Sequence, residues 1–214
     1  MKRSVVPEIL DSLPHDDPTA QRSRRDLRRI NFLMGNFRWL RSELSSLPQD
    51  TPLVEVGSGD GQFLKSLALD GWKNLTAIDF APRPSDLPDT ITWLQEDMLT
   101  ALPKTRGGIL IANLFWHHFT DDQLTALASA MTGFDHILLS EPHRSPFASA
   151  LGIPLVPFIN HVTRHDMFVS IRAGFVKGEI PLLWKLKEAG FQFEEVHGLL
   201  GALRLHAWRQ NRER

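Results

Sequence analysis

Short apolar runs alternate with helical patterns along most of the chain after residue 50. Five runs have the length and composition of β-strands: LVEV (53–56), NLTAIDF (74–80), ITWL (91–94), GILIANLF (108–115) and HILLSEP (136–142). Two intervening segments, residues 61–71 and 121–133, carry apolar residues at helical spacing and end in Gly71 and Gly133. Alternating strands and helices predict an α/β fold in which a parallel sheet is covered by helices on both faces.

Prolines interrupt two of the connections between these predicted strands. Residues 81–90 (APRPSDLPDT) contain three prolines, and residues 98–107 (MLTALPKTRG) contain one. Because proline disrupts the interior of a helix, we expect these connections to hold short helices or loops.

The first 50 residues have a different organisation from the rest. Residues 1–20 are rich in Pro, Asp and Ser, which predicts an extended arm or a short helix. Residues 21–47 predict an amphipathic helix. Its apolar positions, at steps of three and four, are Leu27, Ile30, Leu33, Met34, Phe37, Leu40 and Leu44. The arginines of this segment could contact an anionic ligand or form a solvated face. They are Arg22, Arg24, Arg25, Arg28 and Arg29.

Composition narrows the class of protein. The chain has 214 residues, of which 42% are hydrophobic and 23% charged, so one globular domain is the simplest prediction. A formal charge of −1 gives no broad basic surface for nucleic acid or an anionic membrane. There is no cysteine, which excludes disulfides, thiolate metal sites and cysteine nucleophiles. The start MKRSVVPEIL lacks the apolar core of a signal peptide, and no run reaches about 18 apolar residues, so we expect a cytoplasmic protein.

The stretch LVEVGSGDGQFL contains the clearest candidate for a ligand site. A strand that leads through a glycine-rich turn into a helix brings backbone N–H groups and a positive helix end to a nucleotide-like ligand. Gly57, Gly59 and Gly61 occupy alternate positions, whereas a dinucleotide fingerprint needs a glycine at the position of Gln62. A nicotinamide or flavin dinucleotide is therefore disfavoured.

Four features in the correct order, from about Thr51 to Glu141, resemble the class I S-adenosylmethionine-dependent methyltransferases. They are VEVGSGDG, an acidic residue ending the second strand, an acidic residue after the third, and ANLFWHHF after the fourth. The resemblance implies a Rossmann-like, seven-stranded sheet whose last strand is antiparallel. It also implies S-adenosylmethionine as cofactor, bound by Glu55, Gly57, Ser58, Gly59, Gly61, Asp79, Phe80, Asp97, Met98, Asn113 and Leu114.

Three acidic residues have implied roles in this resemblance. Asp79 would receive the ribose hydroxyls, Asp97 would accept from the adenine amino group with Met98 beside the ring, and Glu55 would support the loop and the methionine end. Alone, Asp79 could cap a turn and Asp97 could be a solvated loop residue. Their positions at successive strand ends favour ligand binding. Glu55 lies inside a predicted buried strand, so it must find donors in backbone N–H groups or in a cofactor amine.

Histidines are the candidate catalytic residues. Methyl transfer to a hydroxyl gains from a base that takes the proton, and histidine is the usual base. His117 and His118 follow the fourth predicted strand, and His143 follows the fifth. The alternative is that they bond the backbone or pack under the cofactor.

The acceptor predicted from these residues is a small molecule. Methylases of base amines or glutamine carry Pro-Pro-Tyr or Pro-Pro-Phe after the position of Asn113, whereas this chain has Leu114, Phe115 and Trp116. We expect O-methylation, with C- or N-methylation open. Other hypotheses are a non-catalytic methyltransferase-like subunit that binds cofactor or a partner, and a nucleotide-dependent oxidoreductase or epimerase.

The segment after the fifth strand is the least generic part of the chain. We divide the chain into an N-terminal arm and helix (1–50) and a methyltransferase domain (51–214), in which residues 142–177 form an apolar helical insert. This insert is a predicted lid over a hydrophobic or aromatic acceptor, or else a packed subdomain or a homodimer face. A helix (180–190) and a hairpin (191–209) are predicted to follow.

A metal ion is not expected from the sequence. His161 and His165 have the i, i+4 spacing that could hold an ion on one helix face. No third ligand and no HExxH context accompany them.

Overall fold

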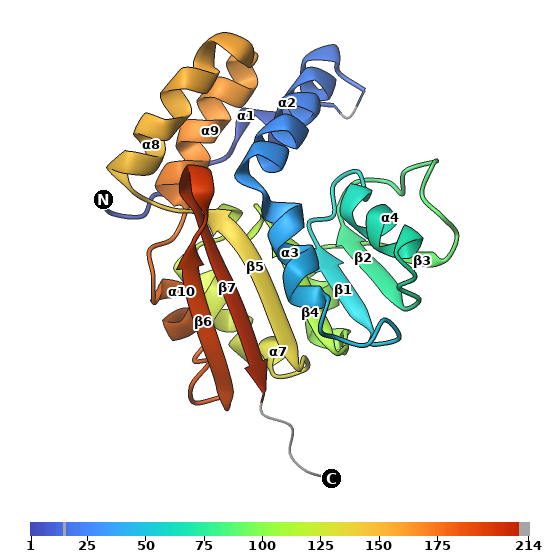
Figure 1. Ribbon diagram of the computed structural model, residues 1–214. Coiled ribbons are helices and arrows are strands. Elements are labelled where there is room, and N and C mark those ends of the chain that lie inside the picture. The colour runs from blue at the N-terminus through green and yellow to red at the C-terminus, as the bar shows by residue number, and fades with distance from the viewer. Residues whose placement is uncertain (15, 210–214) are drawn as a thin grey trace.

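A computed structural model describes residues 1–14 and 16–209, and its centre is one seven-stranded sheet (Figure 1). The strand order is β3-β2-β1-β4-β5-β7-β6, and only β7 runs antiparallel to its neighbours. The strands are β1 (Leu53–Val56), β2 (Leu75–Asp79), β3 (Ile91–Gln95), β4 (Ile109–Asn113), β5 (His136–Pro142), β6 (Phe191–His197) and β7 (Ala202–Arg209). The predicted seven-stranded, mostly parallel sheet is confirmed.

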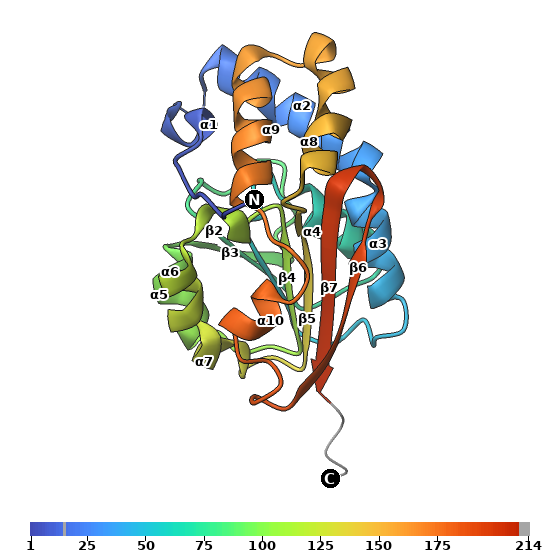
Figure 2. The same cartoon turned by 90° about the vertical axis from the view of Figure 1, so that its left-hand side faces the viewer.

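Helices cover both faces of this sheet, as predicted (Figure 2). One face holds α5 (Met98–Ala101), α6 (Asp121–Ala126), α7 (Ala128–Met131) and α10 (Glu179–Leu183). The other face holds α3 (Asn36–Leu44) and α4 (Gln62–Leu69). Alternate residues of each central strand enter the two cores: Val54 and Val56 face the first, whereas Leu53 faces the second. The central parallel strands are therefore buried on both sides.

The helices depart from the predicted boundaries at three places. The single helix predicted over residues 21–47 is wrong: α2 (Pro18–Met34) ends at Gly35, whose φ of +67° closes the helix with a left-handed cap before α3 begins. The helix predicted over 121–133 is likewise divided at Leu127. The last predicted helix, 180–190, is a short α10 followed by turns.

The proline-rich connections are short, as expected. Residues 81–90 contain no helix, and residues 98–107 hold only α5 and the 3₁₀ turn η1 (Leu102–Lys104). The other 3₁₀ turns are η2 (Trp116–His118), η3 (Ile153–Phe158) and η4 (Leu199–Gly201). Within the described part of the chain, no helix combines the length and the apolar character that a membrane span requires.

A helical layer lies beyond the carboxyl ends of the parallel strands (Figure 1). It combines the N-terminal segment with the insert: α1 (Ile9–Ser12), α2, α8 (Pro146–Gly152) and α9 (His161–Ala173). Helix α9 contacts α1, α2 and α8, so segments far apart in sequence meet above the sheet. Ligands in open α/β sheets bind at this edge, and the layer gives such a site walls.

Candidate functional site

A cavity of about 340 Å³ lies between the strand ends and the helical layer. Eight of the residues predicted to bind cofactor or act in catalysis line it: Glu55, Gly57, Ser58, Gly59, Asn113, Leu114, His117 and His118. Six others do not: Gly61, Asp79, Phe80, Asp97, Met98 and His143. The remaining walls come from the N-terminal segment, α2 and the insert.

The three glycines of the loop after β1 have different tasks. All three have positive φ angles, near +60° to +70°, which favour glycine. A Cβ on Gly57 would lie 2.1 Å from the Phe115 ring, so the absence of a side chain here lets Phe115 pack against the backbone. A Cβ on Gly61 would lie 2.7 Å from Leu87, a core residue. Only at Gly59 is the space around the missing Cβ empty, and this glycine borders the cavity.

Asp79 holds this loop in place from the end of β2. Its Oδ2 accepts a hydrogen bond from the Gly59 N–H at 2.7 Å, and its Oδ1 accepts from the Ala81 N–H at 2.8 Å. Burial raises the pKa of Asp79, against these hydrogen bonds. The neighbouring Phe80 is 70% exposed and so presents an open ring beside the loop. Asp79 therefore couples the second strand to the glycine that faces the cavity.

Glu55 is the most unusual carboxylate of the cavity wall. It lies in the middle of β1 and is 3% exposed, and its Oε2 has no hydrogen-bond partner among the described residues. Burial raises its pKa to about 8. The predicted backbone N–H donors are absent for this oxygen within the described chain. A buried acidic oxygen without a donor is suited to a cationic ligand group.

Asp97 and Met98 lie at the end of β3 but away from the cavity. Asp97 Oδ1 accepts from the Leu99 N–H at 2.8 Å, so this carboxylate caps α5. Met98 is 3% exposed and packs in the core below α5. Their predicted contacts with an adenine ring thus stay a prediction.

Asn113 and Leu114 connect β4 to the cavity. Asn113 donates from Nδ2 to Asn31 Oδ1 at 3.2 Å, which links β4 to α2, and its own Oδ1 is buried without a partner among the described residues. Leu114 has a φ of +55°, a strained conformation for a side chain with a Cβ. Strain of this kind is typical of functional loops.

His117 is held between two carboxylates. Its Nδ1 lies 2.8 Å from Glu141 Oε2, and its Nε2 lies 3.5 Å from Glu8 Oε1. Burial opposes the charged imidazole, but the hydrogen bonds to Glu141 and Glu8 outweigh burial and raise the pKa of His117 to about 9. A histidine that is already protonated at neutral pH cannot take a proton, so this arrangement disfavours the predicted role of His117 as a base.

The other two candidate histidines differ in position. His118 lines the cavity, its side chain is 28% exposed, and its Nδ1 lies 3.4 Å from Asp11 Oδ2. His143 packs edge-on against His197 with 4.3 Å between ring centroids, and burial lowers its pKa. His143 does not line the cavity, so His118 is the candidate histidine that combines a place in the cavity wall with partial exposure.

Sequence reasoning missed Glu8, Asp11 and Glu141. The first two belong to the predicted N-terminal arm, where no local pattern indicated that the chain returns to the strand ends. Glu141 had a usable signal, because it is an acidic residue near the end of β5, the neighbour of β4. Its carboxylate accepts from the Phe115 and Trp116 N–H groups at 3.0 and 2.8 Å. It therefore fixes the segment that carries both histidines.

The upper wall of the cavity is apolar. It is built by α2 and by the insert, and its apolar side chains include Leu27, Ile30, Met34, Leu151, Leu155, Met167 and Ile171. An apolar wall opposite polar strand ends gives the cavity two chemically distinct halves. Such a division is typical of a site that binds a polar cofactor and an apolar partner.

Comparisons with solved structures agree with this architecture. The plantazolicin methyltransferase BpumL in complex with SAH matches with a TM-score of 0.71 and 11% identity, over 92% of each chain. The methyltransferase domain of bacterial CtHen1 matches with a TM-score of 0.57 and 13% identity, over 83% of this chain and 100% of the other. Magnesium protoporphyrin IX methyltransferase from Synechocystis PCC 6803 with bound SAH gives 0.53 and 13%, over 94% and 91%.

The chain has the fold of class I S-adenosylmethionine-dependent methyltransferases. No protein-family model matches it. A human curated protein, EEF1A lysine methyltransferase 2, is 35% identical over 54 residues. This match covers 25% of the chain and 22% of that relative's length. The likeness of fold thus extends over most of the chain, whereas the match to this curated relative covers one short segment.

Proposed function

We propose that this protein transfers a methyl group from S-adenosylmethionine to a small hydrophobic or aromatic acceptor, at a hydroxyl oxygen. The observation that carries the proposal is Glu55: a buried carboxylate oxygen without a donor, in the cavity wall beside the open glycine loop. S-adenosylmethionine carries cationic groups at its methionine end, which suit this carboxylate. The structural neighbours whose names state bound SAH or SAM support the same cofactor.

The chain's own residues would divide the work of binding. The cofactor supplies an electrophilic methyl group when it is bound. Glu55 would face its methionine end, and Gly59, held by Asp79, would allow its close approach to the backbone. The apolar wall from α2 and the insert would hold and orient the acceptor and exclude water. His118, at the cavity wall, is the candidate to accept the hydroxyl proton.

Calorimetric titration with S-adenosylhomocysteine, with a nicotinamide dinucleotide in parallel, tests the cofactor. We expect binding of S-adenosylhomocysteine alone, and we expect Asp79→Ala to weaken it by at least about tenfold because the Gly59 loop loses its anchor. Asp70→Ala is the matched control, since Asp70 caps the end of α4, pairs with Arg41 and does not line the cavity. Unchanged affinity in Asp79→Ala would contradict the placement of the cofactor.

A screen of hydrophobic phenols and carboxylic acids with labelled S-adenosylmethionine tests the acceptor. Product carrying the label on oxygen supports the proposal, whereas label on carbon or nitrogen would correct its atom. Tight binding of S-adenosylhomocysteine with no turnover of any acceptor would favour a non-catalytic subunit instead.

A further inference from the structure

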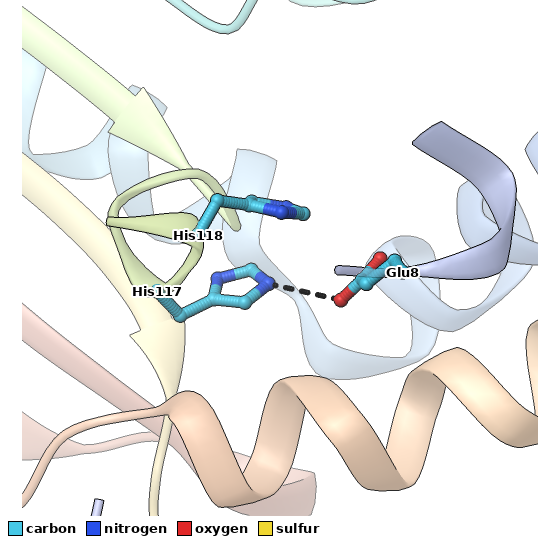
Figure 3. Close-up of side chains that lie close together, drawn as sticks. All are labelled: Glu8, His117 and His118. Atoms are coloured by element: carbon cyan, nitrogen blue, oxygen red, sulfur yellow. Dashed lines mark ion pairs between the residues drawn. The ribbon is translucent and has the colours of Figure 1, made fainter. Parts of the chain in front are cut away.

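We propose that Glu8, His117 and His118 bind a divalent transition-metal ion at the wall of the cavity (Figure 3). Each residue offers one ligand atom, and the three atoms lie within 4.8 Å of one another. The histidines belong to η2, whereas Glu8 precedes α1, so distant parts of the chain build the cluster. It differs from the pair His161 and His165, which the sequence singled out and which has no third ligand in the described chain.

The donor set points to a class of ion. Two imidazole nitrogens and one carboxylate suit Zn²⁺, Fe²⁺ or Co²⁺, whereas Mg²⁺ and Ca²⁺ prefer oxygen ligands. Two histidines with one carboxylate are also a known facial arrangement for divalent iron. Three protein ligands leave coordination positions open, which is typical of a functional rather than a structural metal site.

The surroundings of His117 orient its ring so that one nitrogen, Nε2, points towards the proposed ion. Metal-binding histidines bond their second nitrogen to a carboxylate or carbonyl, which orients the ring. Nδ1 of His117 lies 2.8 Å from Glu141, and Glu141 is itself fixed by two backbone N–H groups of η2 and its flank. Nε2 is therefore the nitrogen directed at Glu8, and an ion bound there would displace the proton that Nε2 carries in the metal-free chain. Nδ1 of His118 likewise faces a carboxylate, that of Asp11, at 3.4 Å.

The carboxylate of Glu8 is held in place from above. The Ser170 hydroxyl on α9 donates to Glu8 Oε1. The next two residues of the chain, Ile9 and Leu10, donate their N–H groups to Asp166 at 2.9 and 3.0 Å. Only 10% of the Glu8 side chain is exposed. Glu8 thus has a defined position, although it comes from a segment near the chain end.

All three residues border the cavity, so an ion held by them would face its contents. The open positions would accept an oxygen of the acceptor, such as a hydroxyl or a carboxylate. This role rests on the proposed function, and it narrows the acceptor class to molecules with a metal-binding oxygen next to an apolar body. With His118 occupied as a ligand, the ion would orient that oxygen and favour loss of the hydroxyl proton, in place of proton acceptance by His118 itself.

Metal titration of the chelator-treated full chain tests the site. We expect one equivalent of Zn²⁺ by calorimetry and a visible absorption band with Co²⁺, and no comparable binding of Mg²⁺. Glu8→Gln and His118→Ala should each weaken Zn²⁺ binding by at least about tenfold. Both side chains lie at the cavity wall rather than in the core, so both variants are expected to fold. His161→Ala, which removes an exposed histidine from α9, is the matched control and should bind as the unaltered chain does.

Three results would overturn the inference: no stoichiometric Zn²⁺ binding, binding unaffected by both variants, or an equal loss in His161→Ala. Titration of the same metal-free sample with S-adenosylhomocysteine separates this inference from the proposed function. Cofactor binding without metal binding would remove the ion and leave the methyltransferase proposal standing. Metal binding without cofactor binding would leave the ion and remove its proposed role.

Discussion

Glu55 is subject to two conflicting requirements. Its buried position favours the neutral acid, whereas a cationic ligand needs the charged carboxylate. Folding removes its carboxylate from water, and no described donor compensates Oε2. A pKa raised to about 8, from 4.5, means that the folded chain holds a proton more tightly than the unfolded chain. Its contribution to stability is therefore complete below about pH 4.5 and is lost as the pH rises through 8. A cationic ligand needs the charged form of Glu55, and this form destabilises the folded protein when no ligand is bound.

Glu55→Gln separates these two requirements. The amide resembles the protonated acid, so we expect the melting temperature of the variant to match the unaltered chain near pH 5 and to exceed it near pH 8.5. The difference in free energy of unfolding at pH 8.5 should be on the order of a few kcal/mol. Calorimetry should also show weaker S-adenosylhomocysteine binding. Thermal melts across this pH range measure the first effect.

The control for this prediction is Glu188→Gln, at an exposed position outside the cavity. Its melting temperature should follow the unaltered chain at every pH. A Glu55→Gln variant that loses stability equally at pH 5 and pH 8.5 would mean that Glu55 is held by hydrogen bonds rather than destabilised by burial.

Candidate site residues could be predicted from the sequence where they lie close together along the chain. The glycine loop, Glu55 in β1 and Asp79 at the end of β2 lie within one continuous stretch, so their order in sequence indicated that they lie near one another. Glu8 could not be placed in this way. Its partners are 109 and 110 residues away in sequence, at His117 and His118, and tertiary contacts such as the packing of α1 on α9 bring it there.

At the scale of elements, the loop after β1 shows why glycine spacing alone is ambiguous. Gly57 and Gly61 are needed because side chains of the protein itself, Phe115 and Leu87, occupy the space. Gly59 has no such neighbour, and it is the glycine that Asp79 fixes. Two of the three glycines thus serve packing, and one leaves room for a ligand.

Alanine substitutions distinguish these tasks. Gly59→Ala should fold, with a loss of about 1 kcal/mol for the left-handed conformation, and should weaken S-adenosylhomocysteine binding by at least about tenfold because the methyl group enters the ligand's space. Gly57→Ala should lower the melting temperature much further, since its Cβ would meet Phe115 at 2.1 Å. Thermal melts and calorimetric titration measure the two effects.

Gly190→Ala is the matched control for Gly59→Ala. Gly190 also has a positive φ, +81°, with nothing within 4 Å of its missing Cβ, and it precedes β6 away from the cavity. The two variants should lose similar stability, and only Gly59→Ala should lose affinity. Equal affinities in both variants would mean that the ligand does not approach Gly59.

Element boundaries were predicted less well than element types. Residues 21–47 keep one helical pattern of apolar positions through Gly35, so periodicity gave no sign of a break. The break arises because Gly35 adopts a left-handed cap and because Arg204 of β7 donates to the Met34 carbonyl at 2.7 Å. The second cause is a contact with the other end of the chain, which no local pattern contains.

At the scale of the whole molecule, the N-terminal segment completes the cavity rather than extending from it. Arg3 donates to the carbonyls of Ala173 and Phe119 at 2.7 and 2.8 Å, and it lies over the Phe175 ring. Further along, Glu8 reaches His117. The segment therefore joins the insert to the loop after β4. The predicted separation into an N-terminal arm and a catalytic domain remains a prediction, but the arm supplies part of the cavity wall.

Asp166 holds the start of α1 against α9. It is 3% exposed on α9 and accepts the N–H groups of Ile9 and Leu10, the first two residues of α1. In Asp166→Ala both donors lose their acceptor, and leaving such groups unsatisfied costs roughly 1–3 kcal/mol. We expect residues 1–14 to separate more often from α9. Hydrogen exchange measured by mass spectrometry should show faster exchange there, with β1 and β4 unchanged.

Asp166→Ala also tests whether the N-terminal segment contributes to metal binding in the cavity. Asp166 is not a proposed metal ligand, yet its loss should weaken Zn²⁺ binding because Glu8 would leave the two histidines part of the time. S-adenosylhomocysteine binding should change less than about threefold, since the glycine loop is held by Asp79 and not by α1. Asp122→Ala, at an exposed position of α6, is the control and should alter neither quantity. Faster exchange of residues 1–14 with undiminished metal binding would show that Glu8 is not a ligand, and unchanged exchange would show that Asp166 does not hold the segment.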